Sequence, residues 1–185
     1  MSAALGNLEW IAALSRADLL ARPVARAVSP LDDIRVAQID PALADTVAFC
    51  AQYDVPMEQS ANCVVVAARR GGETRLAACV VLATTRADVN GLVRRHLDAR
   101  KASFAAMDDA VAQTGMEYGG ITPVGLPIDW PLLVDAEVAA ADHVVVGSGL
   151  RRSKLLVRGA WLTGLPGAQV IDGLGLPAKP TSSDA

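Results

Sequence analysis

Alternation of hydrophobic and polar positions predicts several short strands in this chain. Two apolar runs, 63–68 and 76–82, flank a polar stretch with adjacent glycines at 71 and 72. This arrangement is typical of a buried β-hairpin. A β-branched alternation predicts a further strand over 34–39. Other short apolar runs predict four more strands, at 102–105, 132–134, 143–146 and 155–157.

Helical spacing occurs between these strands. An amphipathic pattern predicts a short helix over 8–20, followed by a connector that contains prolines. Asp40 and Pro41 are a suitable N-cap and first-turn pair for a helix that continues to about residue 52. Two more helices are predicted over 88–97 and 108–114, and the second begins with two acidic residues at its positive end.

The predicted hairpin argues against a simple alternation of parallel strands and helices. We therefore expect an α+β fold, with a curved, largely antiparallel mixed sheet or half-barrel surrounded by helices. A chain of 185 residues fits one main domain. We expect an N-terminal helical extension and connector at 1–30, the main domain at 31–176 and a disordered polar tail at 177–185.

Composition narrows the class of protein. The chain is 52% hydrophobic, which is enough to build a core without disulfides. Its apolar runs are far shorter than the ~20 residues that cross a bilayer, and no secretory leader is evident, so no membrane partner is expected. Three cysteines without a C-x-x-C pair suit a reducing compartment and indicate a cytoplasmic protein. Neither a zinc spacing nor a nucleotide-binding motif is present, so no metal and no cofactor are expected.

The net charge of −3 conceals a strong segregation of charge along the chain. Residues 69–101 contain eight basic and three acidic side chains, residues 102–150 contain no basic and seven acidic ones, and residues 151–158 contain four basic and no acidic ones. Two basic islands in an acidic chain predict a local anion-binding face, and a solvated surface is the alternative.

The segment 115–131 contains glycines and prolines that interrupt any period, which predicts a loop. Its adjacent glycines, Gly119 and Gly120, let a ligand approach the main chain. Such a loop can aim N–H groups at the oxyanion that forms when water attacks an ester, and a rigid turn is the alternative. The turn 147–149, followed by basic residues, can hold a phosphate or a carboxylate, and a solvated edge strand is the alternative. We interpret Cys63 as a buried core thiol because valines follow it.

The order of these features resembles the YbaK/ProX family of aminoacyl-tRNA deacylases and prolyl-tRNA synthetase editing domains. The resemblance covers roughly 34–174, and the stretch Tyr118-Gly119-Gly120-Ile121-Thr122-Pro123-Val124-Gly125 is its most specific element. It implies that 31–176 is an editing domain that hydrolyses the ester of mischarged tRNA in trans, as a second sieve for small side chains. The implied partner is the acceptor end of aminoacyl-tRNA. An aminoacyl-tRNA synthetase is a second candidate partner, and no binding to DNA is expected.

The resemblance also implies roles for individual residues. The family has a functionally important lysine at the start of the first hairpin strand, where this chain has Asn62, which brings no positive charge. A polar pocket residue of the family matches Lys154, so we hypothesise that the cation has moved across the pocket. The resulting predictions are catalytic residues Gly119, Gly120, Ile121, Thr122, Pro123 and Asn62, and substrate-binding residues Asp135, Gly147, Ser148, Gly149 and Lys154.

The basic islands gain a purpose if the partner is RNA, because guanidinium and ammonium groups bind phosphates. Two alternatives remain open at this point. One is a catalytically inactive family member that binds a tRNA acceptor end, an amino acid or a protein partner, and the other is a hydrolase of other small acyl esters. The predicted tRNA-binding residues are Arg94, Arg95, Arg100, Lys101, Arg151 and Arg152.

Overall fold

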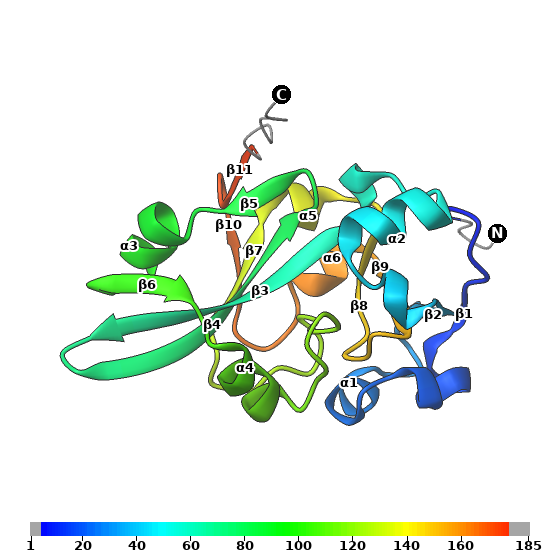
Figure 1. Ribbon diagram of the computed structural model, residues 1–185, viewed down its shortest axis with the longest axis horizontal. Coiled ribbons are helices and arrows are strands. Elements are labelled where there is room, and N and C mark those ends of the chain that lie inside the picture. The colour runs from blue at the N-terminus through cyan, green and yellow to red at the C-terminus, as the bar shows by residue number, and fades with distance from the viewer. Residues whose placement is uncertain (1–4, 178–185) are drawn as a thin grey trace.

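The computed structural model describes residues 5–177, and its strands form three sheets (Figure 1). The largest sheet has five strands in the order β10-β7-β4-β3-β6. Strands β3, β4 and β6 are antiparallel, whereas β7 runs parallel to both β4 and β10. Their bounds are β3 (Ala61–Arg70), β4 (Glu73–Leu82), β6 (Lys101–Phe104), β7 (Leu132–Asp135) and β10 (Ala168–Ile171).

The second sheet has four antiparallel strands in the order β1-β2-β9-β8. A parallel bridge between Ser60 and Val145 brings it against the start of β3. A small third sheet pairs β11 with β5. The bounds are β1 (Ile11–Ala12), β2 (Arg35–Gln38), β5 (Thr85–Ala87), β8 (Val144–Gly147), β9 (Ser153–Val157) and β11 (Gly175–Pro177).

Short helices surround the sheets (Figure 1). Helix α3 lies beside β6 at one end of the long hairpin, and α2 and α1 lie at the other end near the four-stranded sheet. The α-helices are α1 (Arg22–Ala27), α2 (Thr46–Tyr53), α3 (Arg94–His96), α4 (Met107–Thr114), α5 (Ala136–Ala140) and α6 (Gly159–Leu162). Tighter or wider helical turns are η1 (Ala13–Leu19), η2 (Pro41–Leu43), η3 (Met57–Gln59) and η4 (Val89–Val93).

The main core joins the two larger sheets. Val36 and Leu155 of the four-stranded sheet share one buried cluster with Val80 and Leu132 of the five-stranded sheet. Val24 of α1 belongs to the same cluster and is fully buried, so the N-terminal segment is part of the core. Among residues 5–177, no helix has the length and apolar character required to cross a membrane.

The expected α+β class with mixed, largely antiparallel pairing is confirmed, and so is the hairpin. Its two-residue turn uses Gly71 and Gly72, both with positive φ, which suits the twist of paired antiparallel strands. The loop predicted between α4 and β7 is also present. Pro177 is the last residue of β11, and the remainder of the predicted tail lies outside the described residues.

Two predicted helices are wrong in detail. The pattern over 8–20 does not form an α-helix, because Ile11–Ala12 pairs with β2 and the following turn η1 contains a non-helical residue, Arg16. The helix expected after Asp40 stops after one turn. A second aspartate, Asp45, caps the separate helix α2 by accepting the N–H of Val47, so two capping signals divide one predicted helix into two.

Candidate active site

A cavity of about 560 Å³ opens where the start of β3, the end of β8, α4 and the 115–131 loop meet. Its walls come from segments that are far apart in the sequence. The apolar part of the wall includes Ala61, Val64, Val65, Ala105 and Ala110, and the polar part includes Asp45, Thr46, Asn62, Arg151 and Lys154.

Lys154 is the buried cation of the cavity, with 9% of its surface exposed. Its position follows from sheet register, because Lys154 on β9 pairs with Gly147 at the end of β8, and both residues line the cavity. The ammonium Nζ donates to the carbonyl of Ala44 at 3.0 Å and lies 5.1 Å from the ring centroid of Phe49. Burial lowers the pKa of Lys154 to about 8. An ammonium has three N–H donors, and within the described residues one of them is used, so two remain for a ligand.

Asn62 faces the same cavity from the start of β3. Its Oδ1 accepts a hydrogen bond from Thr46 Oγ1 at 2.6 Å. This bond ties β3 to α2 and fixes which end of the amide is the acceptor. Among residues 5–177, the NH₂ group of Asn62 has no hydrogen-bond partner, so it is free to donate to a ligand.

The loop predicted to carry main-chain donors is fastened to the turn that follows β8. The N–H of Gly149 donates to the carbonyl of Gly120 at 2.8 Å, and the N–H of Glu117 donates to the carbonyl of Gly149 at 2.9 Å. The N–H of Gly120 is occupied by the carbonyl of Glu117. Within the described part of the chain, the N–H groups of Gly119 and Ile121 have no partner, and both residues line the cavity.

Arg151 spans the cavity mouth. Its Nη2 donates to the carbonyl of Pro41 at 3.0 Å, and its Nη1 donates to the carbonyl of Tyr118 at 3.4 Å. Its main-chain N–H donates to Glu117 Oε2 at 2.6 Å. The guanidinium therefore links the N-terminal side of the cavity with the glycine-rich loop and leaves a positive charge at the opening.

Two aromatic side chains line the cavity and remain exposed. Phe104 at the end of β6 is 65% exposed, and Tyr118 in the loop is 60% exposed. Aromatic residues make up only 4% of this chain. Exposed aromatic rings on a cavity wall suit contact with a planar, apolar ligand group.

Cys63 is the thiol that lines the cavity. It packs against the main core, as its valine-rich neighbourhood predicts, but it is half-buried and not fully buried. Burial raises the pKa of the Cys63 thiol, so the thiol is protonated at neutral pH. A protonated thiol is a poor nucleophile, and the site does not fit covalent catalysis by this cysteine.

The part of the chain that forms this cavity matches a known protein family. A family model described as an aminoacyl-tRNA editing domain matches residues 40–164, a range that contains every residue lining the cavity. The chain belongs to the aminoacyl-tRNA editing domain family. The resemblance to the YbaK family that the glycine-rich loop indicates is thereby confirmed.

Solved structures share the editing-domain fold. One is described as "a putative trans-editing enzyme for prolyl tRNA synthetase"; it is 21% identical, with a TM-score of 0.70 over 82% of this chain and 94% of that chain. A scaffold from a study of epitope backbone grafting is 22% identical, with a TM-score of 0.70 over 82% and 95% of the two chains. A hypothetical protein is 20% identical, with a TM-score of 0.68 over 77% and 91%. No curated protein sequence matches the chain.

The editing domain brings five of the predicted site residues to the cavity wall in addition to Arg151. They are Asn62, Gly119, Ile121, Gly147 and Lys154. Sequence reasoning missed Thr46, Phe104 and Asp45, which also line the wall. Nothing local marks Thr46 or Phe104 as site residues, because their proximity to the loop arises from the packing of the sheets.

Other predicted residues of the loop and turn support the cavity from behind. Gly120, Thr122 and Pro123 are buried, and Thr122 Oγ1 has no hydrogen-bond partner among residues 5–177. Ser148 is fully buried, with its Oγ 2.7 Å from Ser153 Oγ, and Gly149 is buried beside it. These residues do not line the cavity, because the loop and the turn bury them in the protein interior.

Asp135 is also placed away from the cavity. Its Oδ1 accepts the N–H of Glu137 at 2.8 Å and so caps α5, and its Oδ2 accepts the N–H of Gly175 at 2.5 Å. Both carboxylate oxygens are therefore committed to the fold, which corrects the expectation that Asp135 binds substrate. In residues 5–177, no group of three or more His, Cys, Asp or Glu side chains could hold a metal ion.

The two basic islands are separated in the editing domain. Arg151 lines the cavity and Arg152 follows it, with Nη2 donating to the carbonyl of Asp18 at 2.8 Å. Residues 94–101 lie on α3 and the start of β6, toward the far end of the hairpin, and none of them lines the cavity (Figure 1).

Proposed function

We propose that this protein is a free-standing aminoacyl-tRNA deacylase that hydrolyses the ester between a wrong amino acid and the terminal adenosine of tRNA. The observation that carries the proposal is that Lys154 lines one cavity together with Asn62, Gly119 and Ile121. The editing domain then comprises residues 31–176, with 1–30 as an extension. A cytoplasmic site of action, among charged tRNAs and their synthetases, follows from this substrate.

Hydrolysis of an ester places negative charge on the former carbonyl oxygen as water adds to the carbonyl carbon. The two unused N–H donors of Lys154 and the N–H groups of Gly119 and Ile121 supply the groups that stabilise such an oxyanion. Because the ammonium is buried, its interaction with a developing charge is stronger than it would be in water. Losing one such donor typically costs about 100- to 1,000-fold in rate.

Asn62 has a different role in this scheme. Thr46 holds its Oδ1, so the NH₂ is presented to a ribose hydroxyl or to the ester carbonyl. The water loses its proton with help from the neighbouring ribose hydroxyl of the substrate, and that proton ends on the departing ribose oxygen as the ester bond breaks. The scheme uses no metal and no side-chain nucleophile, in agreement with the protonated state of Cys63.

The walls of the cavity indicate which substrates fit. Ala105, Ala110 and Val65 provide a small apolar surface, which suits the small side chains that a synthetase discriminates poorly by binding alone. The exposed rings of Phe104 and Tyr118 suit stacking with the terminal adenine, which contributes about 1 to 3 kcal/mol per base in other proteins.

A panel of mischarged tRNAs tests the proposal. We expect the protein to release the amino acid from at least one small-side-chain ester well above the spontaneous rate, and Lys154→Ala to lose most of that rate. If no ester in the panel is hydrolysed faster than in buffer, although the protein binds the tRNA, the deacylase proposal is overturned in favour of an inactive tRNA-binding family member.

A further inference from the structure

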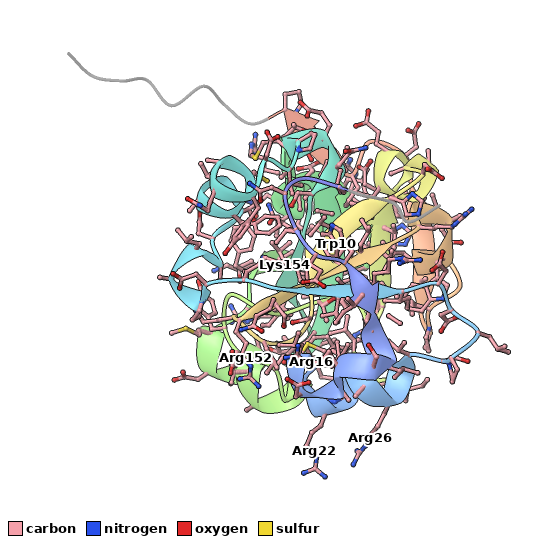
Figure 2. The ribbon with its side chains drawn as sticks, turned by 90° about the vertical axis from the view of Figure 1, so that its right-hand side faces the viewer. Trp10, Arg16, Arg22, Arg26, Arg152 and Lys154 are labelled. Carbon is pink, nitrogen blue, oxygen red and sulfur yellow. The ribbon has the colours of Figure 1, made fainter. Side chains whose placement is uncertain are left out.

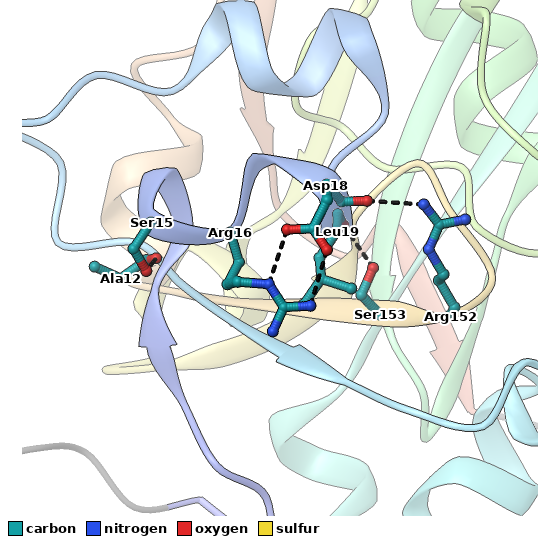
Figure 3. A network of polar contacts seen from close by, with 7 residues as sticks. All are labelled: Ala12, Ser15, Arg16, Asp18, Leu19, Arg152 and Ser153. Atoms are coloured by element: carbon teal, nitrogen blue, oxygen red, sulfur yellow. Dashed lines mark hydrogen bonds and ion pairs between the residues drawn. The ribbon is translucent and has the colours of Figure 1, made fainter.

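The N-terminal segment 13–27 lies outside the range matched by the family, yet it is attached to the turn that carries Arg151 and Arg152. The N–H of Ala21 donates to the carbonyl of Ser148 at 3.1 Å. Ser153 Oγ donates to the carbonyl of Leu19 at 2.6 Å, and Arg152 reaches the carbonyl of Asp18 (Figure 3).

The N-terminal segment also packs closely against this turn, in addition to the hydrogen bonds. Gly149 has a φ of +82°, and a Cβ there would lie 2.4 Å from the Cβ of Ala21. Val24, one turn further along α1, is fully buried in the main core. Side chains on α1 therefore occupy fixed positions relative to the cavity mouth.

Two of those side chains are arginines that face solvent. Arg22 and Arg26 are exposed, and within residues 5–177 neither has an ion-pair partner. They are four residues apart on one helix and so lie on the same face. Figure 2 shows both projecting from α1 away from the body of the protein, on the side where Arg152 also lies.

The acidic side chain of this segment, Asp18, forms an ion pair with Arg16. Asp18 receives two hydrogen bonds at 2.8 Å from Arg16, one to each carboxylate oxygen (Figure 3). The same ion pair lowers the pKa of Asp18, so this carboxylate stays charged and paired. Its charge is therefore matched by Arg16 and does not cancel those of Arg22, Arg26 and Arg152.

Helix α4, which forms another part of the cavity wall, carries the reverse charge. Helix α4 contributes Met107 and Ala110 to the cavity wall, and its first turn contains Asp108 and Asp109, both exposed. No basic residue occurs between 102 and 150. A polyanion that enters the cavity with one end is repelled by α4 and attracted by the arginines of α1 and of residues 151 and 152.

We infer that the phosphate backbone of the substrate RNA leaves the cavity over Arg151 and Arg152 and binds Arg22 and Arg26 of α1. This inference rests on the proposed function for the choice of RNA as the polyanion. The N-terminal segment is then an RNA-binding extension of the editing domain. Residues 94–101 of the first basic island do not lie on the path of the RNA backbone.

The test uses the full chain and two double variants with equal loss of charge. Arg22→Ala/Arg26→Ala removes the α1 charges, and Arg95→Ala/Arg100→Ala removes two exposed charges from the other island. Binding of uncharged tRNA is measured across a range of salt concentrations. We expect the α1 variant to bind more weakly and to lower the slope of log affinity against log salt by about one per arginine. The control should keep the wild-type slope.

A second substrate separates this inference from the deacylase proposal. An aminoacyl-adenosine ester has no phosphodiester backbone, so the α1 variant should hydrolyse it at the wild-type rate. A wild-type salt slope for the α1 variant, or a reduced slope only in the control, overturns the inference. If the α1 variant alone loses tRNA affinity but no protein hydrolyses either ester, the RNA-binding surface stands and the deacylase proposal fails.

Discussion

The carbonyl oxygen of Gly120 lies against the Cα of Gly147, so closely that a Cβ on Gly147 would come within 2.4 Å of it. This approach brings the glycine-rich loop onto the end of β8, and the loop and strand together form one wall of the cavity. The same carbonyl accepts the N–H of Gly149, so the position of the loop depends on the absence of a side chain at residue 147.

Gly147→Ala should therefore displace the loop. The obstructing atom is main chain and cannot rotate away, so we expect a loss of about 1 to 3 kcal/mol in the free energy of unfolding and a lower deacylation rate. Gly164→Ala is the matched control, because a Cβ there meets its nearest neighbour at an ordinary 3.5 Å. Urea denaturation and the deacylation assay measure both effects. Equal behaviour of the two variants would contradict this account of the loop.

Lys154 should give the deacylation rate a characteristic pH dependence. Burial lowers the pKa of this lysine to about 8, so the ammonium form predominates at pH 7 and is lost above pH 8. We expect the enzymatic rate, corrected for spontaneous ester hydrolysis, to fall as pH rises through about 8. Lys154→Met should be much slower and should lack this limb. A wild-type rate that keeps rising to pH 10 would argue against a role for the ammonium.

The same lysine should reduce the stability of the folded protein at neutral pH. Its pKa is below the ordinary 10.5 in the folded state, so the unfolded chain binds more protons between pH 8 and pH 10.5. Wild-type stability should therefore increase with pH across this window. We expect Lys154→Met to be at least as stable as wild type at pH 7, with any advantage shrinking toward pH 10.5, as measured by urea denaturation. A strongly destabilised variant at pH 7 would show that Lys154 is kept for folding.

Asn62 should be sensitive to both truncation and added charge. Asn62→Ala removes the NH₂ donor and the partner of Thr46, and we expect kcat/KM to fall by about 10- to 100-fold, or ~1.4 to 2.7 kcal/mol. Asn62→Lys places a second cation in the cavity that holds Lys154, which should lower the pKa of Lys154 further and move the falling limb below pH 8. A cavity with no catalytic role would tolerate both changes.

Thr122 should be replaceable despite its place in the glycine-rich loop. It is 0% exposed, and its Oγ1 is buried with no hydrogen-bond partner in the described part of the chain, which destabilises the folded state. Thr122→Val has nearly the same shape and removes that hydroxyl. We expect stability to rise by about 1 to 3 kcal/mol, with deacylation unchanged. A large loss of activity in a well-folded Thr122→Val protein would restore Thr122 to the catalytic residues.

Local pattern predicts the elements of this protein better than their ends. The hairpin follows from two apolar runs around Gly71 and Gly72, because strand alternation and the turn are properties of neighbouring residues. The segment 8–20 shows the limit of the same reasoning. Its amphipathic pattern fits a helix, but pairing of Ile11–Ala12 with β2 offers hydrogen bonds that local periodicity does not anticipate.

The class of fold, the glycine-rich loop and the separation of basic from acidic segments can be predicted from local sequence, since each depends on residues close together in the chain. Which side chains meet in space depends on how distant segments pack. The ammonium of Lys154 reaches the carbonyl of Ala44 across 110 positions, and the segment that carries Arg22 is held against the turn before Arg152 because Ala21 packs on Gly149. Such contacts depend on sheet register and on packing between distant segments, and neither is encoded in local periodicity.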